Sequence, residues 1–373
     1  MGVYIHVPFC RQRCRFCAFY LEIAKPDQID AFCLALAQEI ALHRQNQITQ
    51  HPLQSVYIGG GTPTVLPVSQ LVSILQLVQI SWPTEPSLEI TIETHPSTVR
   101  PSDLDRLVEA GFNRLSVGIE SLNQQELASL GRPGRVRDAK QVMRAARAAG
   151  FHNINLDLMY GLPGQTLQSW TETVQSALEL EPTHLSCYAL TVEEGTELAR
   201  DVARHLIPPP DEALQIEMEM AAETIVQAAG FERYEISNYA LPGFACRHNL
   251  LYWTDGDYLG LGPSAQSYVD GFRFGNVADL SAYITALAAG YLPLEERVKL
   301  TTDERNREAL IFGLRLAKGV PHRLIHPNTS QYRTLQLLAT KGLIEWQDDY
   351  VCLTPLGRRY ADMVMETLYL ALP

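Results

Sequence analysis

The alternation of short, apolar, β-rich runs with longer helical patterns constrains the fold of this chain most strongly. The runs occupy residues 3–7, 55–58, 88–94, 114–119, 153–160 and 184–191, and helical patterns lie between them at 28–43, 68–79, 101–110, 137–149 and 167–180. Strands that alternate with helices in this way form βα units around a parallel sheet. The sequence therefore predicts an α/β fold, either a barrel or an open partial barrel. In such folds the chemistry gathers where the strands run into the loops that follow them.

The remainder of the chain predicts a second, smaller domain. Three consecutive prolines at 208–210 interrupt the pattern, and Asp211 is expected to cap a helix that runs toward Ala228. We predict a core domain at 1–230, a connecting region at 231–295 and a C-terminal domain at 296–373. In the last, helical patterns near 303–317 and 330–341, strands at 343–346 and 350–354, and a final helix resemble a winged-helix-like domain.

Composition and charge exclude some classes of function. The net charge of −12 argues against a broad electrostatic interaction with nucleic acid, and the basic residues between 132 and 147 follow a helical pattern typical of a solvated face. No stretch approaches the ~20 apolar residues that span a bilayer. The first residues enter the first strand without a charged leader. We therefore expect a cytoplasmic protein, with loose membrane association left open.

Three of the seven cysteines, Cys10, Cys14 and Cys17, lie within eight residues directly after the first predicted strand. This clustering and the odd count argue against a disulfide framework. Three thiolates on one loop can bind three irons of a 4Fe-4S cluster and leave the fourth iron open to another ligand. Zinc is the alternative, but a structural zinc site needs four protein ligands. His6 and Cys33, the nearest candidates, do not extend the spacing.

The segment Cys10-Arg-Gln-Arg-Cys14-Arg-Phe-Cys17, followed by a predicted partial barrel, resembles the radical S-adenosylmethionine (SAM) superfamily over residues 1 to about 230. The resemblance implies a partial (β/α)6 barrel in which the open iron binds the amino and carboxylate groups of SAM. An electron from the cluster then cleaves the sulfonium to give a 5′-deoxyadenosyl radical. The resemblance also implies that Phe16 contacts the adenine and that a donor such as flavodoxin or ferredoxin supplies the electron.

The segment Gly59-Gly60-Gly61-Thr62-Pro63 follows the second predicted strand. Consecutive glycines let the backbone approach a ligand closely. Taken alone, the segment is equally consistent with a tight strand-to-helix turn. Beside the cysteine loop it resembles the loop that binds the methionine end of SAM, which assigns Gly60, Gly61 and Thr62 to SAM binding.

Three carboxylates, Glu93, Glu120 and Asp157, fall near the ends of predicted parallel strands. Acidic side chains in apolar strands need partners, and the positively charged SAM is a natural one. The alternative is that each carboxylate pairs with an internal arginine or lysine. Arg132 and Tyr4 also match family positions that contact SAM. Glu120 departs from the family pattern, because close relatives carry Gln there.

The segments 4–10, 59–63 and 157–164, together with the C-terminal domain, resemble the group around oxygen-independent coproporphyrinogen III oxidase. One branch of this group decarboxylates coproporphyrinogen III to protoporphyrinogen IX in porphyrin biosynthesis. The other, the HemW-type heme chaperones, binds heme and passes it to apo-hemoproteins. The oxidases carry a fourth cysteine at the position of Phe19, which this chain lacks. Residues 248–253 reproduce the HNxxYW signature of the chaperones, so we predict a chaperone that lacks the oxidase activity.

The HNxxYW segment offers candidate heme contacts. The imidazole of His248 can ligate heme iron, and Tyr252 and Trp253 can pack on the macrocycle. The alternative is a structural aromatic corner with a buried histidine. SAM cleavage on another substrate is a third functional hypothesis, because the cluster site is complete in either case. The sequence assigns no catalytic residue. It does not distinguish a homodimer from a monomer.

Overall fold

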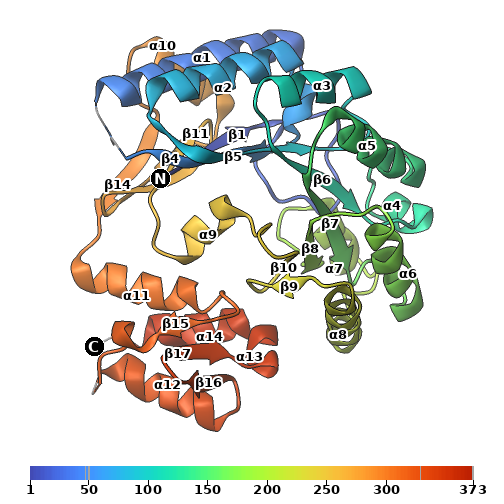
Figure 1. Ribbon diagram of the computed structural model, residues 1–373, viewed down its shortest axis with the longest axis vertical. Helices are drawn as coiled ribbons and strands as arrows, with labels where there is room; N and C mark the ends of the chain where they lie inside the picture. The colour runs from blue at the N-terminus through green and yellow to red at the C-terminus, as the bar shows by residue number, and fades with distance from the viewer. Residues whose placement is uncertain (47, 49–50, 328, 372–373) are drawn as a thin grey trace.

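The computed structural model describes residues 1–46, 48, 51–327 and 329–371. Its main element is a curved sheet of 12 strands in the order β14-β13-β12-β11-β1-β4-β5-β6-β7-β8-β10-β9 (Figure 1). All neighbouring pairs from β11 to β8 are parallel, and the pairs outside them are antiparallel. The parallel strands are β1 (Gly2–Val7), β4 (Leu53–Gly60), β5 (Thr84–Thr94), β6 (Arg114–Glu120), β7 (Asn153–Tyr160), β8 (His184–Ala189) and β11 (Tyr258–Leu261).

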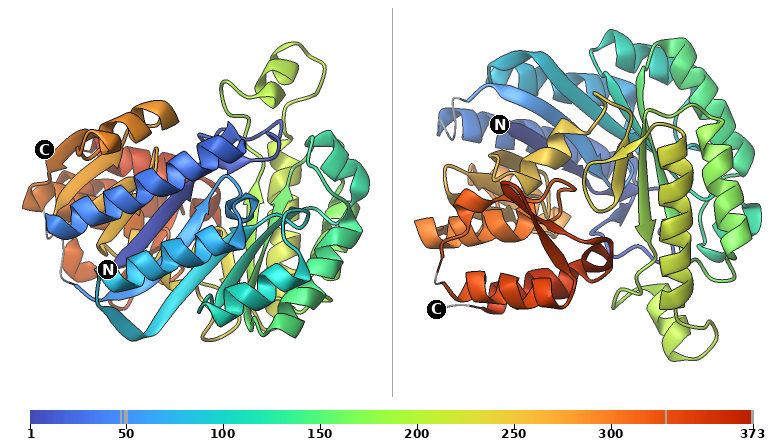
Figure 2. Two further views of the ribbon diagram at one scale, coloured as in Figure 1. Left: turned by 90° about the horizontal axis from the view of Figure 1, so that it is seen from above. Right: turned by 60° about the horizontal axis from the view of Figure 1, so that its bottom comes forward.

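Amphipathic helices cover the outer face of this sheet (Figure 2). They are α1 (Pro26–Gln45), α2 (Val68–Ser81), α3 (Pro101–Glu109), α5 (Val136–Ala149), α6 (Leu167–Leu178), α8 (Glu212–Ala228) and α10 (Leu280–Ala288). Contacts between α10 and α1, α1 and α2, α2 and α3, and α3 and α5 join five of them into one layer, and α6 packs against α8. Apolar strand residues such as Ile5, Ile58 and Ile92 are fully buried beneath it. The six predicted βα strands and the α/β partial barrel are therefore confirmed.

Shorter elements lie in the connections. They are β2 (Phe9–Cys10), β3 (Glu22–Ile23), the 3-10 helix η1 (Pro63–Val65), α4 (Gln124–Ser129), α7 (Glu197–Ala203) and α9 (Arg247–Trp253). The predicted break at the three prolines falls between α7 and α8. The Asp211 carboxylate caps α8 as expected, because it accepts hydrogen bonds from the backbone N–H groups of Ala213 and Leu214 at 3.0 and 3.1 Å.

The segment predicted as a connecting region also completes both edges of the sheet. Besides β11 it supplies β9 (Glu232–Arg233), β10 (Asn238–Ala240), β12 (Gln266–Val269) and β13 (Phe272–Asn276). Strand β14 (Leu294–Lys299), at one edge of the same sheet, crosses the boundary predicted between residues 295 and 296. Strand β11 pairs with β1, and its Leu259 and Leu261 are fully buried in the main core. The barrel side of the molecule therefore extends well beyond residue 230.

The C-terminal domain has its own small core and its own sheet. It contains α11 (Thr302–Gly313), β15 (Val320–Pro321), the 3-10 helix η2 (His322–Leu324), α12 (Ser330–Thr340), β16 (Ile344–Gln347), β17 (Tyr350–Leu353), α13 (Pro355–Arg359) and α14 (Ala361–Leu370). Strands β15, β17 and β16 form an antiparallel sheet beside the helices, which is the winged-helix-like arrangement predicted. Leu335, Val351 and Val364 are fully buried between these elements. Helix α11 contacts α9, so the domain packs beneath the barrel (Figure 1).

Across the described ranges, no helix combines the length and the apolar character needed to cross a membrane.

Candidate metal centre and cofactor site

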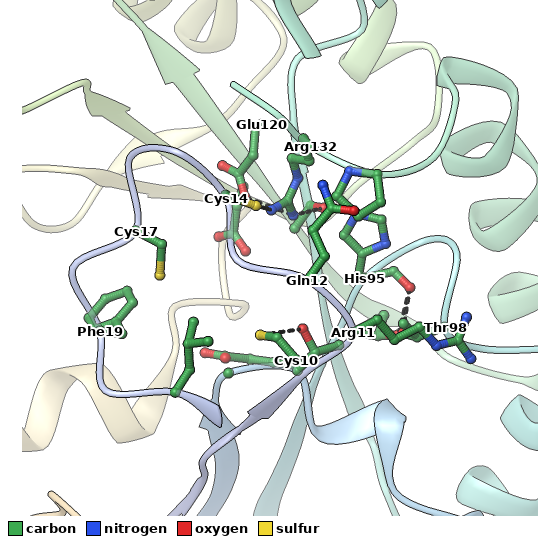
Figure 3. A pocket seen from close by; sticks show the side chains of 18 of the residues that line it. Cys10, Arg11, Gln12, Cys14, Cys17, Phe19, His95, Thr98, Glu120 and Arg132 are labelled. Carbon is green, nitrogen blue, oxygen red and sulfur yellow. Dashed lines mark hydrogen bonds and ion pairs between the residues drawn. The ribbon is translucent and has the colours of Figure 1, made fainter. Parts of the chain in front are cut away.

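A cavity of about 290 Å³ lies at the C-terminal ends of the parallel strands. This is the edge at which functional side chains gather in parallel βα folds. Most of the residues that the sequence singles out line this cavity, part of which is shown in Figure 3. They are Cys10, Cys14, Phe16, Cys17, Gly60, Gly61, Thr62, Glu93, Glu120, Arg132 and Asp157.

The three cysteines approach this cavity from different sides (Figure 3). The sulfur atom of Cys10 lies 3.4 Å from the hydroxyl of Thr62. The sulfur atom of Cys14 accepts a hydrogen bond from the guanidinium of Arg132 at 3.6 Å. All three thiols are half-buried and free of disulfides. Burial raises the pKa of Cys10 and Cys14, and the positive charge of Arg132 opposes this shift, as bound iron would.

Polar contacts fix the path of the cysteine loop. The Arg13 guanidinium donates to the backbone oxygens of Cys17, Phe19 and Leu21 at 3.2, 3.3 and 3.0 Å. The Arg15 guanidinium pairs with Glu197 of α7 at 2.9 Å and with Asp201. The loop is thus held in shape by its own arginines while its cysteines stay available.

The spacing of the three sulfur atoms favours a cluster over a single ion. Zinc binds thiolates at about 2.3 Å, so three sulfurs on one zinc lie within about 4.6 Å of one another. Among the described residues, one group of three potential metal ligands has all its ligand atoms within 4.8 Å of one another. It consists of His51, Asp257 and Asp270, and not of the three cysteines. The three cysteine sulfur atoms are not all within 4.8 Å of one another, an arrangement that suits separate irons of a cubane better than a single zinc ion.

The glycine segment lies directly against the start of the cysteine loop. The N–H groups of Gly61 and Thr62 donate to the backbone oxygens of Val7 and Phe9 at 2.8 and 2.7 Å. A Cβ atom at Gly61 would lie 2.6 Å from the Phe9 oxygen, and Gly60 has a φ of 108°. Both positions therefore require glycine, for close approach and for a left-handed backbone respectively.

Glu93, in β5, points into the cavity beside the glycine segment. Its carboxylate accepts hydrogen bonds from the hydroxyl of Tyr57 at 2.7 Å and from the N–H of Gly60 at 3.2 Å. Burial raises the pKa of Glu93 to about 7. A cationic ligand at this carboxylate would favour its ionised form.

Glu120 and Arg132 form an ion pair at the cavity wall. Their closest nitrogen and oxygen atoms are 3.0 Å apart, and the Tyr188 hydroxyl donates to the other Glu120 oxygen at 2.6 Å. Glu120 has a φ of 61° at an irregularity in the pairing of β6 with β7, which turns its side chain into this position. Arg132 also donates to the backbone oxygen of Gly118 at 2.5 Å. Glu120 therefore pairs with an internal arginine, which was the alternative to SAM contact in the sequence analysis. Its side chain still lines the cavity.

Asp157 lies deeper, at the floor of the cavity. It accepts hydrogen bonds from the side chains of Asn155 at 2.8 Å and Ser116 at 3.3 Å, and burial raises its pKa. The Oδ1 atom of Asn155 in turn lies 2.6 Å from the Nδ1 atom of His184. A polar layer inside the barrel thus holds Asp157 in place.

Two predicted SAM contacts take different places. Phe16 lines the cavity and packs with the small apolar cluster around Leu130 and Met159. Tyr4 does not line the cavity. Its hydroxyl lies 3.2 Å from the Nδ1 atom of His6, and its ring centroid is 6.1 Å from that of Tyr57.

The cavity wall also contains residues that the sequence reasoning did not single out. Tyr188 bonds to Glu120, and His95 and Gln12 complete the rim (Figure 3). Tyr188 lies two residues after Ser186, on the face of β8 that carries polar atoms. That polar alternation in an otherwise apolar strand is the signal that would have found it.

The HNxxYW segment forms α9 at the opposite ends of the strands. His248 is 1% exposed. Its Nδ1 atom lies 2.9 Å from the Ser55 hydroxyl at the start of β4, and its Nε2 atom lies 2.9 Å from the Tyr252 hydroxyl. Burial lowers the pKa of His248 to about 3, so the ring is neutral. The Arg315 guanidinium stacks over the Trp253 ring, 4.5 Å from its centroid. Heme ligation by His248 would require the contact at the ligating nitrogen, to Ser55 or to Tyr252, to break.

Comparison with known proteins places this geometry in a family. The radical SAM superfamily pattern matches residues 4–177, and the pattern of the HemN C-terminal domain matches residues 300–360. The heme chaperone HemW of Mycobacterium tuberculosis is 35% identical over 98% of this chain and 94% of its own length. The chain belongs to the HemW family of radical SAM proteins. The HemW of Bacillus subtilis, 34% identical over 96% of each chain, supports the same assignment.

A solved structure agrees with the HemW family assignment at the level of the fold. Coproporphyrinogen III oxidase (HemN) from Escherichia coli is 25% identical, covers 98% of this chain and 89% of its own, and superposes with a TM-score of 0.87. Membership of the radical SAM superfamily implies a 4Fe-4S cluster and SAM. The three cysteines are consistent with the 4Fe-4S cluster, and the glycine segment and the buried carboxylates are consistent with SAM.

Proposed function

We propose that this protein is a heme chaperone that binds a 4Fe-4S cluster, SAM and heme and delivers heme to apo-hemoproteins. The observation that carries the proposal is identity of 35% over nearly the full length of a protein named heme chaperone HemW. Phe19 supports it. This residue stands where the oxidases carry a fourth cysteine, and it is 68% exposed beside the cluster loop.

In this proposal Cys10, Cys14 and Cys17 hold the cluster, which supplies an electron and an open iron site. The open space beside the glycine segment receives the methionine end of SAM, and Glu93 faces its ammonium group. Arg132 donates to the Cys14 sulfur and so stabilises a thiolate ligand.

Phe16 and Asp157 have the remaining roles in SAM binding. Phe16 offers an aromatic face to the adenine, because it lines the cavity next to the third cysteine. Asp157 is fixed at the floor, where its carboxylate can accept hydrogen bonds from SAM. Tyr4 acts from behind the wall through its packing on Tyr57, the donor to Glu93.

The exposed side of the cysteine loop suits an electron donor. Arg11 and Arg13 are exposed and lie beside Cys10 and Cys14 in the sequence. Phe19 projects from the same loop (Figure 3). A negatively charged donor such as flavodoxin or ferredoxin would find positive charge and an apolar contact within reach of the cluster. We expect docking there to weaken with ionic strength.

The oxidase function is the second candidate, because the fold matches HemN with a TM-score of 0.87 and the SAM cavity is complete. The test is anaerobic reconstitution with iron and sulfide, followed by heme titration beside a decarboxylation assay with coproporphyrinogen III, SAM and a reductant. One heme bound per chain without decarboxylation is the expected result. Turnover to protoporphyrinogen would establish the oxidase instead.

A further inference from the structure

A second, larger cleft lies between the barrel and the C-terminal domain. It has a volume of about 600 Å³ and is bounded by β8 and α8 on one side and by α13 and α14 on the other. We propose that this cleft binds heme, with Arg359 facing a propionate and Met363 facing the iron. The inference rests on the heme chaperone function proposed above and names the site at which that function is carried out.

The size of the cleft suits a macrocycle, and its lining combines apolar side chains with polar and charged ones. Binding sites for ligands of this size commonly measure about 300–1,000 Å³ and combine apolar walls with a few polar groups. Ile216 and Ile236 line one side. Tyr360 and Met363 line the other, although they are 47% and 41% exposed. A macrocycle between these walls would remove both exposed side chains from water.

The charges of the cleft fit an occupant with carboxylates. Arg315, Arg358 and Arg359 line it. Arg315 lies 3.6 Å from Glu235, and Arg358 lies 3.3 Å from Glu223. The half-buried Arg359 side chain has no hydrogen bond or ion pair within the described residues. An unpaired guanidinium in a chain of net charge −12 is available for a bidentate contact with a propionate.

Acidic side chains also border the cleft. Glu219 is engaged with Arg233 at 3.1 Å. Glu212 and Asp362 are exposed at the rim. Solvent screens rim charges strongly, so they weaken a propionate contact less than a buried acid would.

Met363 is the side chain best suited to the iron. A thioether is an established axial ligand of heme and needs no deprotonation. The Met363 sulfur accepts one weak hydrogen bond, from the Thr367 hydroxyl at 3.6 Å, which it would lose on binding iron. Cys187 also lines the cleft, but burial raises its pKa to about 12 and keeps it a neutral thiol.

The cleft adjoins the SAM cavity through one side chain. Tyr188 lines both spaces. Its hydroxyl donates to Glu120 at 2.6 Å, Glu120 pairs with Arg132 at 3.0 Å, and Arg132 donates to Cys14 at 3.6 Å. Heme against Tyr188 would therefore contact a continuous chain of polar contacts that ends on a cluster ligand.

The test uses the full chain after cluster reconstitution. Heme is titrated into the parent protein and into Arg359→Glu and Met363→Leu, with Arg333→Glu and Met365→Leu as matched controls in the same domain. Arg333 is exposed and does not line the cleft, and Met365 packs on the C-terminal core. Thermal unfolding and cluster absorbance verify that each variant is folded.

We expect Arg359→Glu to weaken heme binding at least tenfold and Met363→Leu to shift the Soret band, while both controls behave as the parent. Heme binding should also alter the EPR signal of the reduced cluster. Parental heme affinity and spectra in both cleft variants would overturn the proposed site, and loss of heme in a folded His248→Ala protein would then place heme at α9. Failure of the parent protein to bind heme would instead refute the chaperone function itself.

Discussion

Glu93 offers a quantitative test of the SAM cavity. Its pKa of about 7, in place of the ordinary 4.5, means that ionising it costs about 3 kcal/mol more in the folded protein than in the unfolded chain. Because the pKa is raised, the stability that the neutral carboxyl contributes is fully present below about pH 4.5 and is lost as pH rises through 7. Glu93→Gln should therefore be more stable than the parent by up to about 3 kcal/mol at pH 8 in the absence of SAM.

The same substitution should weaken SAM binding. A hydrogen bond to a charged group contributes about 1.5–3 kcal/mol, so Glu93→Gln is expected to lower SAM affinity about 10- to 150-fold at pH 8. In the parent protein, affinity should fall as pH drops below 7, because the carboxyl must lose a proton before it can pair with a cation. The variant should lack this part of the pH dependence.

Equilibrium SAM titration of the reconstituted protein between pH 6 and 8, with thermal unfolding in parallel, measures both effects. Glu85→Gln, near the other end of the same strand, is the control and should follow the parent. Tyr57→Phe should move the pH midpoint upward, because the Tyr57 hydrogen bond lowers the pKa of Glu93. Parental SAM affinity and an unchanged pH profile in Glu93→Gln would refute the reasoning.

Four further outcomes are expected. Cys14→Ala should abolish cluster absorbance and SAM binding, and a variant that keeps both would contradict the cluster assignment. Gly61→Ala should lower the iron content after reconstitution, because its Cβ would lie 2.6 Å from the Phe9 backbone oxygen. Glu120→Gln should change SAM affinity less than tenfold in titrations, since an amide can keep contacts to both neighbours. His248→Ala should lower the free energy of unfolding by about 2–4 kcal/mol in denaturant melts, because it leaves a cavity and two hydroxyls without partners. An unchanged midpoint would refute its structural role.

Local patterns predict much of this fold. The six parallel strands and the helices between them follow from hydrophobic periodicity, and the Asp211 cap follows from the proline break. Strands β11 to β13 are short, and Gly260 and Gly275 lie within them. Strand β11 pairs with β1, and β12 and β13 are added to β11 in turn. A local sequence pattern cannot predict this pairing with a strand about 250 residues earlier in the chain.

The candidate site was predictable where a motif carries its own chemistry. The cysteine spacing and the glycine segment identify the cavity, and Glu93 and Asp157 line it. The contact of Tyr188 with Glu120 depends on how β6, β7 and β8 curve together. It joins residues 68 positions apart in the sequence, which no local pattern predicts.

The HNxxYW segment shows the limit of a motif match. The letters identify the family, but they do not record that His248 is buried between Ser55 and Tyr252. Likewise, the heme cleft proposed here brings together β8 and α14, which lie far apart along the chain.

Heme delivery is the most direct test of the central claim. The reconstituted protein, loaded with one heme, is mixed with an apo-hemoprotein in the presence of SAM and a reductant, and the acceptor's absorption spectrum is followed against heme carried by serum albumin. The account predicts transfer that is faster than from albumin and that is lost in Cys14→Ala. Transfer no faster than from albumin, or equally fast without the cluster, would contradict it.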